Sequence, residues 1–396
     1  INSSHTLVID KIYTDNTLMK IAIFGGSFNP VHSEHINIVK AALSSLYLDR
    51  VIIMPSCETP NKSGRLSASS QDRLNMCRLA FKGVDAAEVS DYELTQGGIS
   101  YSYLTCRAIK QKYPHDDLYF IVGADMLENF QQWKNPGEIL KCVKLAVCAR
   151  ENEESLLKVI QCFEKAFGQI PVMFNYVGKN VSSTKIRTLC ALGESIEGYT
   201  DEKVATYIKD NNLYVLPQLL KVKSYLTPER WAHTVRVAIM SAENCQRLKI
   251  PEHKAITAAA LHDCAKYLKP DSPALAGFTC PEGVPEPVIH QYAGAYVAEH
   301  TFGITDKEIL EAIRYHTSGK QNMQPLTKLL YLCDMLEDGR EFEGVQKLRE
   351  IFSHSIDDAL YSSFEHQVVY LKNAGKPIYP LTLHAYEYLK ENKNEQ

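Results

Sequence analysis

The stretch MKIAIFGGSFNPVHSEH, residues 19–35, joins a short apolar run to two glycines and then to two histidines. The apolar run is typical of a buried strand, and glycines at its end let the backbone approach a ligand closely because they lack a Cβ. If a helix begins near Ser33, its N–H groups and its dipole point to the same place, with His32 and His35 one turn apart. This arrangement predicts a phosphate site.

Downstream of this stretch, β-rich runs alternate with longer amphipathic segments as far as residue 215. The runs are RVIIMPS, LYFIVGAD, KLAVCAR and VMFNYVG, and the amphipathic segments include residues 69–81 and 101–112. Strands that alternate with helices imply βαβ units. The first part of the chain is therefore predicted to be an α/β domain with a doubly wound parallel sheet.

The pattern changes after YIKDNNLYVL. From Pro228 onward the segments are long, rich in Ala and Leu and helical in period, and Pro and Gly gather at breaks such as PDSPALAG and CPEGVPEP. We therefore expect an α/β domain at 19–216 and an all-α domain at 222–396. Residues 1–18 precede the candidate start at Met19 and are expected to be an extension.

The composition excludes several classes of protein. Among 396 residues, 45% are hydrophobic and 23% charged, and the formal charge of −4 is spread without a basic block, so no long nucleic acid is expected as a partner. No run approaches the roughly 18 apolar residues of a membrane span, so no membrane partner is expected. The 11 cysteines form no CxxC pairs, which argues against a disulfide framework and a cysteine zinc site and favours a reducing, cytoplasmic location.

A second candidate phosphate site is VSSTKIR, residues 181–187. Ser182, Ser183 and Thr184 would cap a helix while offering hydroxyl and N–H donors, and Arg187 lies near the following turn. Either motif alone is more often a structural turn or cap, but two separate anion sites indicate a polyphosphate.

The combination closely resembles the nucleotidyltransferase superfamily, which has GxFxPxHxGH and ISSTxIR motifs. The matching residues are Gly25, Ser27, Phe28, Pro30, His32 and His35, and then Ser182, Ser183, Thr184 and Arg187. Within that superfamily, GADML at 123–127, SYSYLT at 100–105 and Trp133 resemble nicotinate-nucleotide adenylyltransferases. Over residues 19–215 the resemblance implies a Rossmann-like fold and, in NAD biosynthesis, transfer of AMP from ATP to nicotinate mononucleotide, giving deamido-NAD and pyrophosphate.

The resemblance also implies the roles of individual residues. Attack on the α-phosphorus is direct and in line, with Mg²⁺ shared between the phosphates of ATP. The residues expected to stabilise the triphosphate are His32, His35, Lys62 and Arg187. The other residues expected to bind substrate are Gly25, Gly26, Ser27, Phe28, Gly123, Asp125, Ser182, Ser183 and Thr184 for the nucleotide, and Tyr101, Thr105 and Trp133 for the pyridine ring.

Two points stay open for this half. Glu34 stands where the family usually has Gly, and we expect its side chain to face solvent. Another acceptor, such as phosphopantetheine or nicotinamide mononucleotide, is the alternative to nicotinate mononucleotide.

The helical half carries a second constellation. His233 lies in TPERWAHTVRVAIMSAE, the pair His262 and Asp263 in AAALHDCAK, His290 in VIHQYAGA, His316 in IRYHTSG and Asp334 in LLYLCDMLED. A lone histidine on such a helix is usually a core residue. An adjacent His and Asp in an apolar helix change this interpretation, because burying an ionised Asp is costly unless a cation or an ion pair compensates it. A metal centre is then the better account.

This half resembles the HD phosphohydrolase superfamily, whose core ligands correspond to His233, His262, Asp263 and Asp334. The pair His290 and His316 matches its two-metal subset, and YHTSG with YLCDMLEDGREFEGV resembles the symmetrical diadenosine tetraphosphate hydrolases.

The resemblance implies an HD helical bundle over residues 222–392, with Asp263 bridging two metal ions, Fe first and otherwise Mn or Co. Lys266 and Arg236 are placed to hold phosphate, and Arg340 is assigned a phosphate contact. The sequence thus predicts a bifunctional enzyme that also cleaves diadenosine tetraphosphate into two ADP. The alternative is that the helical half is a regulator that binds metal and nucleotide without turnover.

Overall fold

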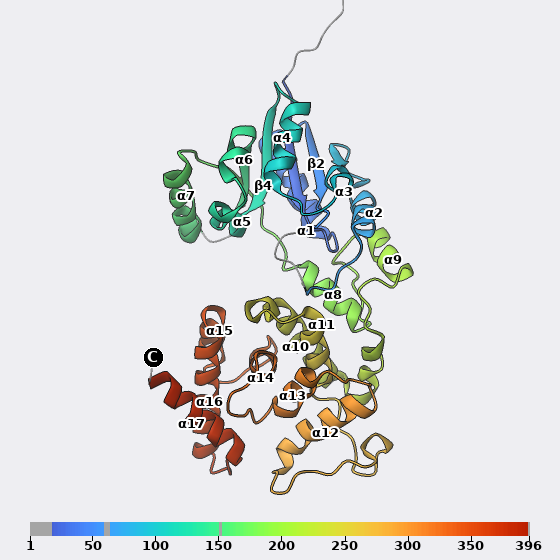
Figure 1. Cartoon of the computed structure of the whole chain (residues 1–396), viewed down its shortest axis with the longest axis vertical. Coiled ribbons are helices and arrows are strands. Elements are labelled where there is room, and N and C mark those ends of the chain that lie inside the picture. Colours follow the sequence, from blue (N-terminus) through green and yellow to red (C-terminus); the bar gives the residue numbers. More distant parts are fainter. Residues whose placement is uncertain (1–17, 59–63, 150–152, 395–396) are drawn as a thin grey trace, which may run out of the picture. The chain divides into compact units, whose positions relative to one another are not determined.

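A computed structural model describes residues 18–58, 64–149 and 153–394, which form two compact units (Figure 1). The first, here called the sheet unit, comprises Ile1–Ser27, Glu34–Glu58 and Phe81–Lys179. The second, the helical unit, comprises Phe28–Ser33, Thr59–Ala80 and Asn180–Gln396. The expected extension lies, apart from Leu18, outside the described residues. The predicted domain limits at 216 and 222 stay a prediction.

Six parallel strands form the sheet, in the order β3-β2-β1-β4-β5-β6. They are β1 (Lys20–Gly26), β2 (Arg50–Pro55), β3 (Ala87–Val89), β4 (Asp117–Gly123), β5 (Lys144–Ala149) and β6 (Val172–Asn175). From β1 the chain proceeds to β2 and β3 on one side and to β4, β5 and β6 on the other, so right-handed crossovers place the two sets of connections on opposite faces. The predicted doubly wound parallel sheet is confirmed, with five strands as expected and the three-residue β3 added.

The helices of the sheet unit cover an apolar core. They are α1 (Ser33–Leu46), α3 (Tyr92–Gln96), α4 (Ser102–Lys112), α5 (Ala124–Glu128), the 3-10 turn η1 (Phe130–Gln132), α6 (Pro136–Cys142) and α7 (Glu153–Phe167). One cluster joins β-branched residues of the strands, such as Ile21 and Ile23, to Ile109 of α4, Phe130 of η1 and Phe163 of α7. Because these strands are buried on both faces, they are nearly continuous in apolar residues.

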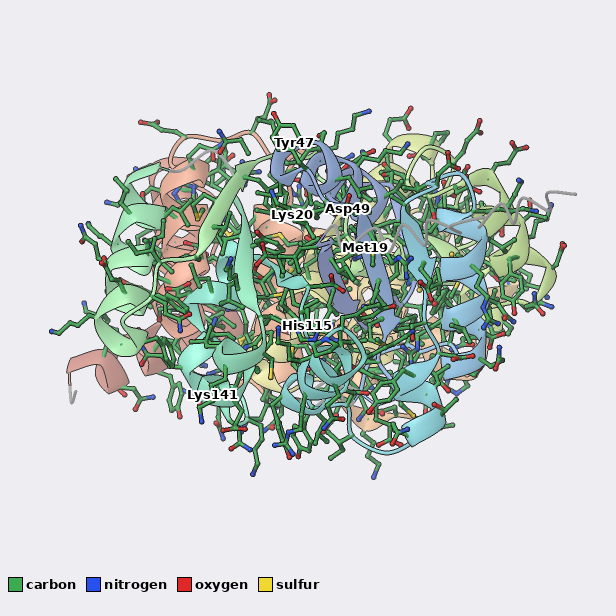
Figure 2. All side chains as sticks on the ribbon, turned by 90° about the horizontal axis from the view of Figure 1, so that it is seen from above. Met19, Lys20, Tyr47, Asp49, His115 and Lys141 are labelled. Carbon is green, nitrogen blue, oxygen red and sulfur yellow. The ribbon has the colours of Figure 1, made fainter. Side chains whose placement is uncertain are left out.

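Met19 and Lys20 lie at the amino end of β1, where Figure 2 labels them together with Asp49 and Tyr47. The Lys20 N–H donates to the Asp49 carboxylate at 2.7 Å, and the Met19 N–H donates to Asp116 at 2.9 Å. The nearby Tyr47 is 80% exposed. The glycines that end β1 and β4 lie at the opposite, carboxyl edge of the sheet, which is therefore the candidate ligand edge.

The helical unit consists of helices and short 3-10 turns. They are α2 (Ser70–Phe81), α8 (Ser183–Ala191), α9 (Glu202–Asp210), η2 (Pro217–Leu219), η3 (Val222–Tyr225), α10 (Pro228–Asn244), η4 (Cys245–Leu248), α11 (Glu252–Leu261), η5 (Pro273–Leu275), α12 (Glu286–His300), α13 (Lys307–Tyr315), α14 (Pro325–Leu336), α15 (Val345–His354), α16 (Ile356–Asn373) and α17 (Pro380–Asn394). The all-α organisation expected from residue 228 onward is confirmed.

Caps and a shared apolar core set the arrangement of these helices. The side chain of Thr227 caps α10, with Pro228 at its first position, and Asp306 and Ser355 cap α13 and α16. Helix α10 packs on α11, α14 and α8, while α13 packs on α11, α12 and α14. One core cluster contains residues of α8 as well as those of α10 to α17, so α8 belongs to the helical core.

All 11 cysteines fall within the described ranges and are free thiols in the structure. Among the helices described, none combines the length and the apolar character needed to cross a membrane.

Candidate active sites

Glycines hold the backbone open at the carboxyl edge of the sheet. Gly25 and Gly26 end β1, and Gly123 ends the adjacent β4. A Cβ on Gly25 would lie 3.3 Å from the Phe120 ring, and one on Gly123 would lie 2.5 Å from the Asp125 carboxylate. The strand order reverses between β1 and β4, which is where doubly wound sheets bind their ligands.

The residues expected near the pyridine ring belong to the sheet unit. Tyr101 precedes α4 and is half-buried, and Trp133 packs its half-buried ring 5.2 Å from that of Phe130. Thr105 is buried, and its hydroxyl donates to the Glu93 carboxyl at 2.5 Å. Burial raises the pKa of Glu93, and the Thr105 hydrogen bond offsets part of that rise. Sequence reasoning missed Glu93, which no motif marks.

The expectation that Glu34 faces solvent is wrong. Its side chain is 2% exposed and accepts the Tyr176 hydroxyl at 2.9 Å, the Lys179 N–H at 2.7 Å and the Asn37 amide at 3.3 Å. A Cβ on Gly178 would lie 2.5 Å from the same carboxylate. The segment after β6 supplies the first two of these donors, so the carboxylate ties that segment to α1.

Helix α1 begins at Ser33, as predicted, and the Ser33 N–H donates to the Tyr199 carbonyl at 3.0 Å. His32, immediately before it, is buried in the helical unit, whereas the half-buried His35 belongs to the sheet unit. Lys62, expected to contact the triphosphate, lies outside the described residues. The candidate transferase residues therefore divide between the two units.

The second predicted phosphate motif caps α8 as expected. The Ser182 hydroxyl accepts the backbone N–H three residues on at 3.1 Å, and the Ser183 hydroxyl donates to the Pro30 carbonyl at 2.8 Å. The Thr184 hydroxyl accepts from Arg187 at 3.0 Å. Pro30 and the α8 motif, far apart in the sequence, thus meet within the helical unit.

The Arg187 guanidinium is 1% exposed and is engaged by the protein itself. It donates to both carboxylate oxygens of Glu252, at 2.9 and 2.5 Å, and to the Asn29 carbonyl at 2.6 Å. Phe28, next to Asn29, is buried in a left-handed conformation with φ of 44°. Arg187 therefore holds the loop that carries the first motif, and Glu252 is a partner that sequence reasoning missed.

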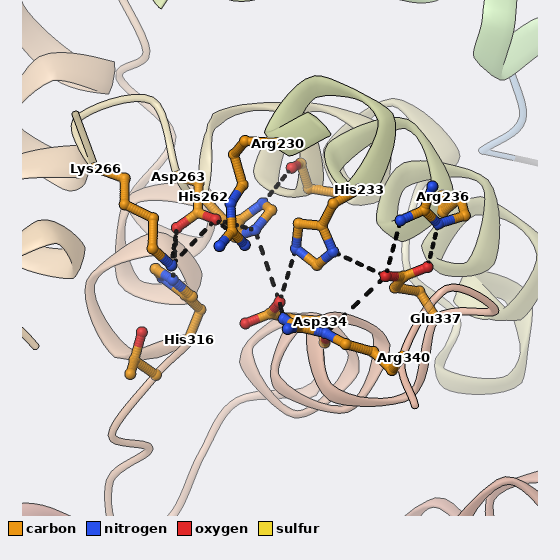
Figure 3. A network of polar contacts seen from close by, with 12 residues as sticks. Arg230, His233, Arg236, His262, Asp263, Lys266, His316, Asp334, Glu337 and Arg340 are labelled. Atoms are coloured by element: carbon orange, nitrogen blue, oxygen red, sulfur yellow. Dashed lines mark hydrogen bonds and ion pairs between the residues drawn. The ribbon is translucent and has the colours of Figure 1, made fainter. Parts of the chain in front are cut away.

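All six predicted metal ligands come together inside the helical unit (Figure 3 shows most of them). They are supplied by successive helices: His233 by α10, His262 and Asp263 by the residues directly after α11, His290 by α12, His316 by the residue directly after α13, and Asp334 by α14. The residues that directly follow α11 and α13 thus place their side chains next to one another.

The first donor group contains His233, His262 and Asp334, each with one ligand atom within 4.8 Å of the others. The Nε2 atom of His233 lies 3.0 Å, and that of His262 3.9 Å, from the same Asp334 oxygen. His262 is completely buried. Three converging donors of this kind are a ligand set for a divalent cation.

The second donor group contains His262, Asp263 and His316, again within 4.8 Å. His290 adds a fourth atom, because its Nε2 lies 3.3 Å from an Asp263 oxygen and 3.1 Å from the Nε2 of His316. Asp263 itself is 1% exposed. The two groups share His262, so the arrangement suits two neighbouring cations.

The tautomers of two rings leave their Nε2 atoms available to a metal. The Nδ1 of His262 donates to the Ala259 carbonyl at 2.6 Å, and the Nδ1 of His316 donates to the Ile313 carbonyl at 2.7 Å. A carbonyl only accepts, so Nδ1 carries a hydrogen in both rings, and the neutral form of each ring has its lone pair on Nε2. Ligating histidines in metal sites are oriented in this way.

The electrostatics also fit a cation site. Burial alone would raise the pKa of Asp263 and Asp334, but His262 beside the former and His233 beside the latter hold both well below the ordinary carboxyl range. Burial and neighbouring positive charge lower the pKa of His290 to about 3, so its ring is neutral and can ligate. Ionised carboxylates and a neutral imidazole are the forms that bind metal.

Cationic side chains surround the two carboxylates. Arg230 contacts Asp263 at 3.0 Å, Lys266 contacts its other oxygen at 3.2 Å, and Arg340 contacts Asp334 at 2.5 Å (Figure 3). Lys266 and Arg340 were predicted as phosphate contacts, and they lie beside the donor groups. Arg230 was missed, although it precedes His233 by one helical turn and thus lies on the same face.

Glu337 is a further residue that sequence reasoning missed. Its carboxylate is 1% exposed and accepts from the His233 Nδ1 at 3.0 Å, from the Gly339 N–H at 2.6 Å and from Arg236. Burial would raise the pKa of Glu337, but these donors lower it to about 2. Arg236, predicted to hold phosphate, therefore pairs with Glu337, which orients a ligand ring. The signal for Glu337 was its position one turn after Asp334.

An apolar cavity of about 340 Å³ opens beside the metal donors. Its lining residues are His316, Thr317, Tyr331, Asp334, Met335, Arg340, Phe342, His366, Gln367 and Tyr370. The rings of Phe342 and His366 lie 4.9 Å apart, and the Tyr331 hydroxyl donates to Gln367 at 2.7 Å. The cavity thus combines aromatic faces with polar groups next to the carboxylate Asp334.

Comparison with known families identifies both halves. A cytidylyltransferase-like profile matches residues 23–189, and an HD domain profile matches residues 230–339. A protein of Mycoplasma genitalium named "Probable nicotinate-nucleotide adenylyltransferase/Ap4A hydrolase" is 30% identical over 82% of this chain and 89% of its own length. Its counterpart in Mycoplasma pneumoniae is 30% identical over 81% and 89%. A nicotinate-nucleotide adenylyltransferase of Clostridium tetani, also named probable, is 36% identical over 50% of this chain and 100% of its own.

Solved structures match each half separately. A predicted HD superfamily hydrolase of Clostridium acetobutylicum, described as involved in NAD metabolism, is 29% identical over 43% of this chain and 96% of its own, with a TM-score of 0.39. A nicotinic acid mononucleotide adenylyltransferase of Plasmodium falciparum complexed with NaAD is 19% identical over 50% and 97%, with a TM-score of 0.41. Since the Mycoplasma relatives align across both halves, this chain belongs to the family of nicotinate-nucleotide adenylyltransferases fused to a C-terminal HD domain.

Proposed function

We propose that the protein is a bifunctional enzyme. The first half transfers AMP from ATP to nicotinate mononucleotide, and the second hydrolyses diadenosine tetraphosphate to two ADP. The observation that carries the second activity is the pair of donor groups that share His262. These groups bring five largely buried His and Asp side chains together, and a purely structural core has no need of such a set. Family membership supports the first.

The transferase half would act by positioning. An oxygen of the mononucleotide phosphate forms a bond to the α-phosphorus of ATP, the bond to the β-phosphate oxygen breaks, and pyrophosphate leaves. Gly25 and Gly123 keep the backbone open at the strand ends, and Ser182 to Thr184 present hydroxyls at the start of α8. Mg²⁺ would accompany the ATP, and Trp133 would face the pyridine ring.

In the hydrolase half, His233, His262, Asp263, His290, His316 and Asp334 would hold two divalent cations, for which Fe is our first choice and Mn or Co the next. Such cations supply Lewis acidity toward phosphoryl oxygens and acidify water. Arg230, Lys266 and Arg340 bring positive charge to the same place and would bind the phosphates. Water adds to a central phosphorus, the middle P–O–P bond breaks, and both products leave as ADP.

The cavity beside Asp334 supports a nucleotide substrate. A cavity of about 340 Å³ with aromatic walls is in the range that accommodates a base, and Arg340 lies where the cavity meets the metal donors. The base would lie among Tyr331, Phe342 and Tyr370 with its phosphates directed toward the carboxylates. This geometry favours a nucleoside polyphosphate over an inorganic one.

The two activities have a chemical reason to be joined. A transferase that admits a second ATP in place of nicotinate mononucleotide would form diadenosine tetraphosphate. A tethered hydrolase would then return this by-product to ADP. Incubating the Asp263→Ala variant with ATP alone is expected to accumulate the dinucleotide, and no accumulation above the parent would contradict the link.

The proposal is tested with the full chain and its Asp263→Ala variant, each given ATP with nicotinate mononucleotide, or diadenosine tetraphosphate with Fe²⁺ or Mn²⁺. Deamido-NAD from both proteins, and ADP from the parent alone, support both activities. Asp357→Ala, which removes an exposed partner of Lys328, is the matched control and is expected to retain both. If the dinucleotide binds but is not cleaved with any metal, the helical half is instead a regulator. If turnover is faster with nicotinamide mononucleotide or phosphopantetheine than with nicotinate mononucleotide, that compound is the acceptor of the transferase.

A further inference from the structure

The buried pair of Arg187 and Glu252 joins residues from the two halves of the sequence. Arg187 belongs to the transferase motif at the start of α8, and Glu252 is the first residue of α11, within the segment that matches the HD domain. Both side chains are 1% exposed, and the guanidinium contacts the two carboxylate oxygens side by side at 2.9 and 2.5 Å. A two-point contact of this kind fixes the orientation of the guanidinium plane.

The same carboxylate holds a second transferase segment. It accepts the Leu66 N–H at 2.8 Å, and the Glu252 N–H donates to the Gly64 carbonyl at 2.7 Å. The Leu66 carbonyl in turn accepts the Asn29 amide at 2.8 Å. Two chains of hydrogen bonds therefore connect Glu252 to Asn29, one through Arg187 and one through Leu66.

Asn29 sits at the centre of the loop that carries the first phosphate motif. Its carbonyl accepts from Arg187, and its side-chain oxygen accepts from the Ala68 N–H at 3.0 Å and from the Tyr214 hydroxyl at 2.8 Å. His32 follows three residues later in the same loop. A carboxylate from the hydrolase half thus completes the hydrogen bonding that shapes this loop.

The charge balance shows why the carboxylate is needed. Arg65 is a second guanidinium close by: burial and Arg187 lower its pKa, whereas Glu252 raises it. Removing the charge of Glu252 would leave two neighbouring guanidinium groups without this counter-charge in a buried place, so Arg187 would move away from its present orientation.

We propose that Glu252 is a positioning residue of the adenylyl transfer reaction, acting through Arg187 and the loop at residues 28–32, although it lies in the HD half of the chain. The inference rests on the proposed transferase activity. Its specific consequence is that Glu252 serves the site for ATP and not the site for the pyridine nucleotide, whose candidate residues Tyr101 and Trp133 belong to the sheet unit and take no part in this network.

The test compares the full-length parent, Glu252→Gln and Glu308→Gln in both reactions. In Glu252→Gln the KM for ATP is expected to rise about tenfold, because one charge-assisted contact is lost, while the KM for nicotinate mononucleotide and the hydrolase kcat/KM stay within about twofold of the parent. Glu308→Gln is the matched control, because Glu308 also contacts α11, at Lys254, but is largely exposed. It is expected to behave as the parent.

Each outcome decides the inference. Unchanged kinetics in Glu252→Gln, or an equal loss of both activities, would overturn it, since the second result assigns Glu252 to the helical core alone. If Glu252→Gln does not fold, Glu252→Asp replaces it, and absence of the split between the two KM values in that variant would overturn the inference. If the parent protein itself had no transferase activity, the proposed function would be refuted. This result is distinct from those above, because it is seen in the parent and not in a variant.

Discussion

The candidate metal centre and the transferase motifs are both proposed to bind phosphate groups, but they assemble their residues differently. All six metal donors lie within the helical unit, and several point their Nε2 or carboxylate atoms at one place from the ends of helices. The transferase residues divide between two units. Two charged side chains there are engaged by the protein itself: Arg187 by Glu252, and Glu34 by the Tyr176 hydroxyl and the Lys179 N–H. One site is thus defined by convergent metal-donor atoms, and the other by protein partners that hold loops in place.

The largest expected effect concerns metal removal. Dialysis against a chelator should reduce cleavage of diadenosine tetraphosphate by at least about 100-fold, because the donor groups lose the cations that polarise phosphate. Readdition of Fe²⁺, Mn²⁺ or Co²⁺ should restore it. Transferase activity, assayed afterwards with excess Mg²⁺, should stay within about twofold. Equal loss and recovery of both activities would contradict the separation of the two sites.

A smaller loss is expected when Glu337 is neutralised. Glu337→Gln weakens the contact to the Nδ1 of His233 and the pair with Arg236, and loss of such a partner behind a metal ligand typically costs about 10- to 100-fold in activity or metal affinity. Titration of the apoprotein with Mn²⁺, followed by the hydrolase rate, measures both quantities.

Glu343→Gln on the exposed surface nearby is the control for Glu337→Gln and should change neither. Metal affinity and rate equal to the parent in Glu337→Gln would mean that His233 is oriented without this carboxylate.

The metal centre was predictable because its signal is local. His262 and Asp263 adjoin at the end of an apolar helix, where an ionised group needs a compensating charge, and the other donors lie on neighbouring helices or directly after them. Glu337 and Arg230 were not predicted, because in the sequence a single charged residue one turn from a ligand cannot be told from a solvent-exposed helical residue. The strands and α1, α2, α4 and α8 followed from periodicity and capping, whereas β3, with three residues, carries too little pattern to detect.

The transferase half was less predictable for a physical reason. Whether Glu34 meets solvent depends on where the segment after β6 passes, and whether Arg187 reaches a phosphate depends on a carboxylate 65 residues further along the chain. Such long-range pairing leaves no periodic trace in the sequence. The resemblance therefore predicts which residues of this half bind substrate, but it does not reveal the partners of Glu34 and Arg187.

The smallest expected effects concern the hydrogen bonds of Glu34. Glu34→Gly restores the residue typical of the resembling motif but leaves the Tyr176 hydroxyl and the Lys179 N–H without their acceptor, so the free energy of unfolding should fall by about 1–3 kcal/mol. Tyr176→Phe removes only one of these hydrogen bonds and should cost about 1 kcal/mol.

Denaturant unfolding of the sheet unit, followed by the fluorescence of Trp133, measures the free energy of unfolding of both variants. Trp231 is replaced by Phe in every protein, so that Trp133 is the sole tryptophan. The ordering matters more than the size, because the carboxylate accepts three hydrogen bonds and the phenol donates one of them. If Glu34→Gly were as stable as the parent, the segment at 176–179 would be held by other contacts. The charge at the family's glycine position would then be a tolerated substitution and not a structural anchor.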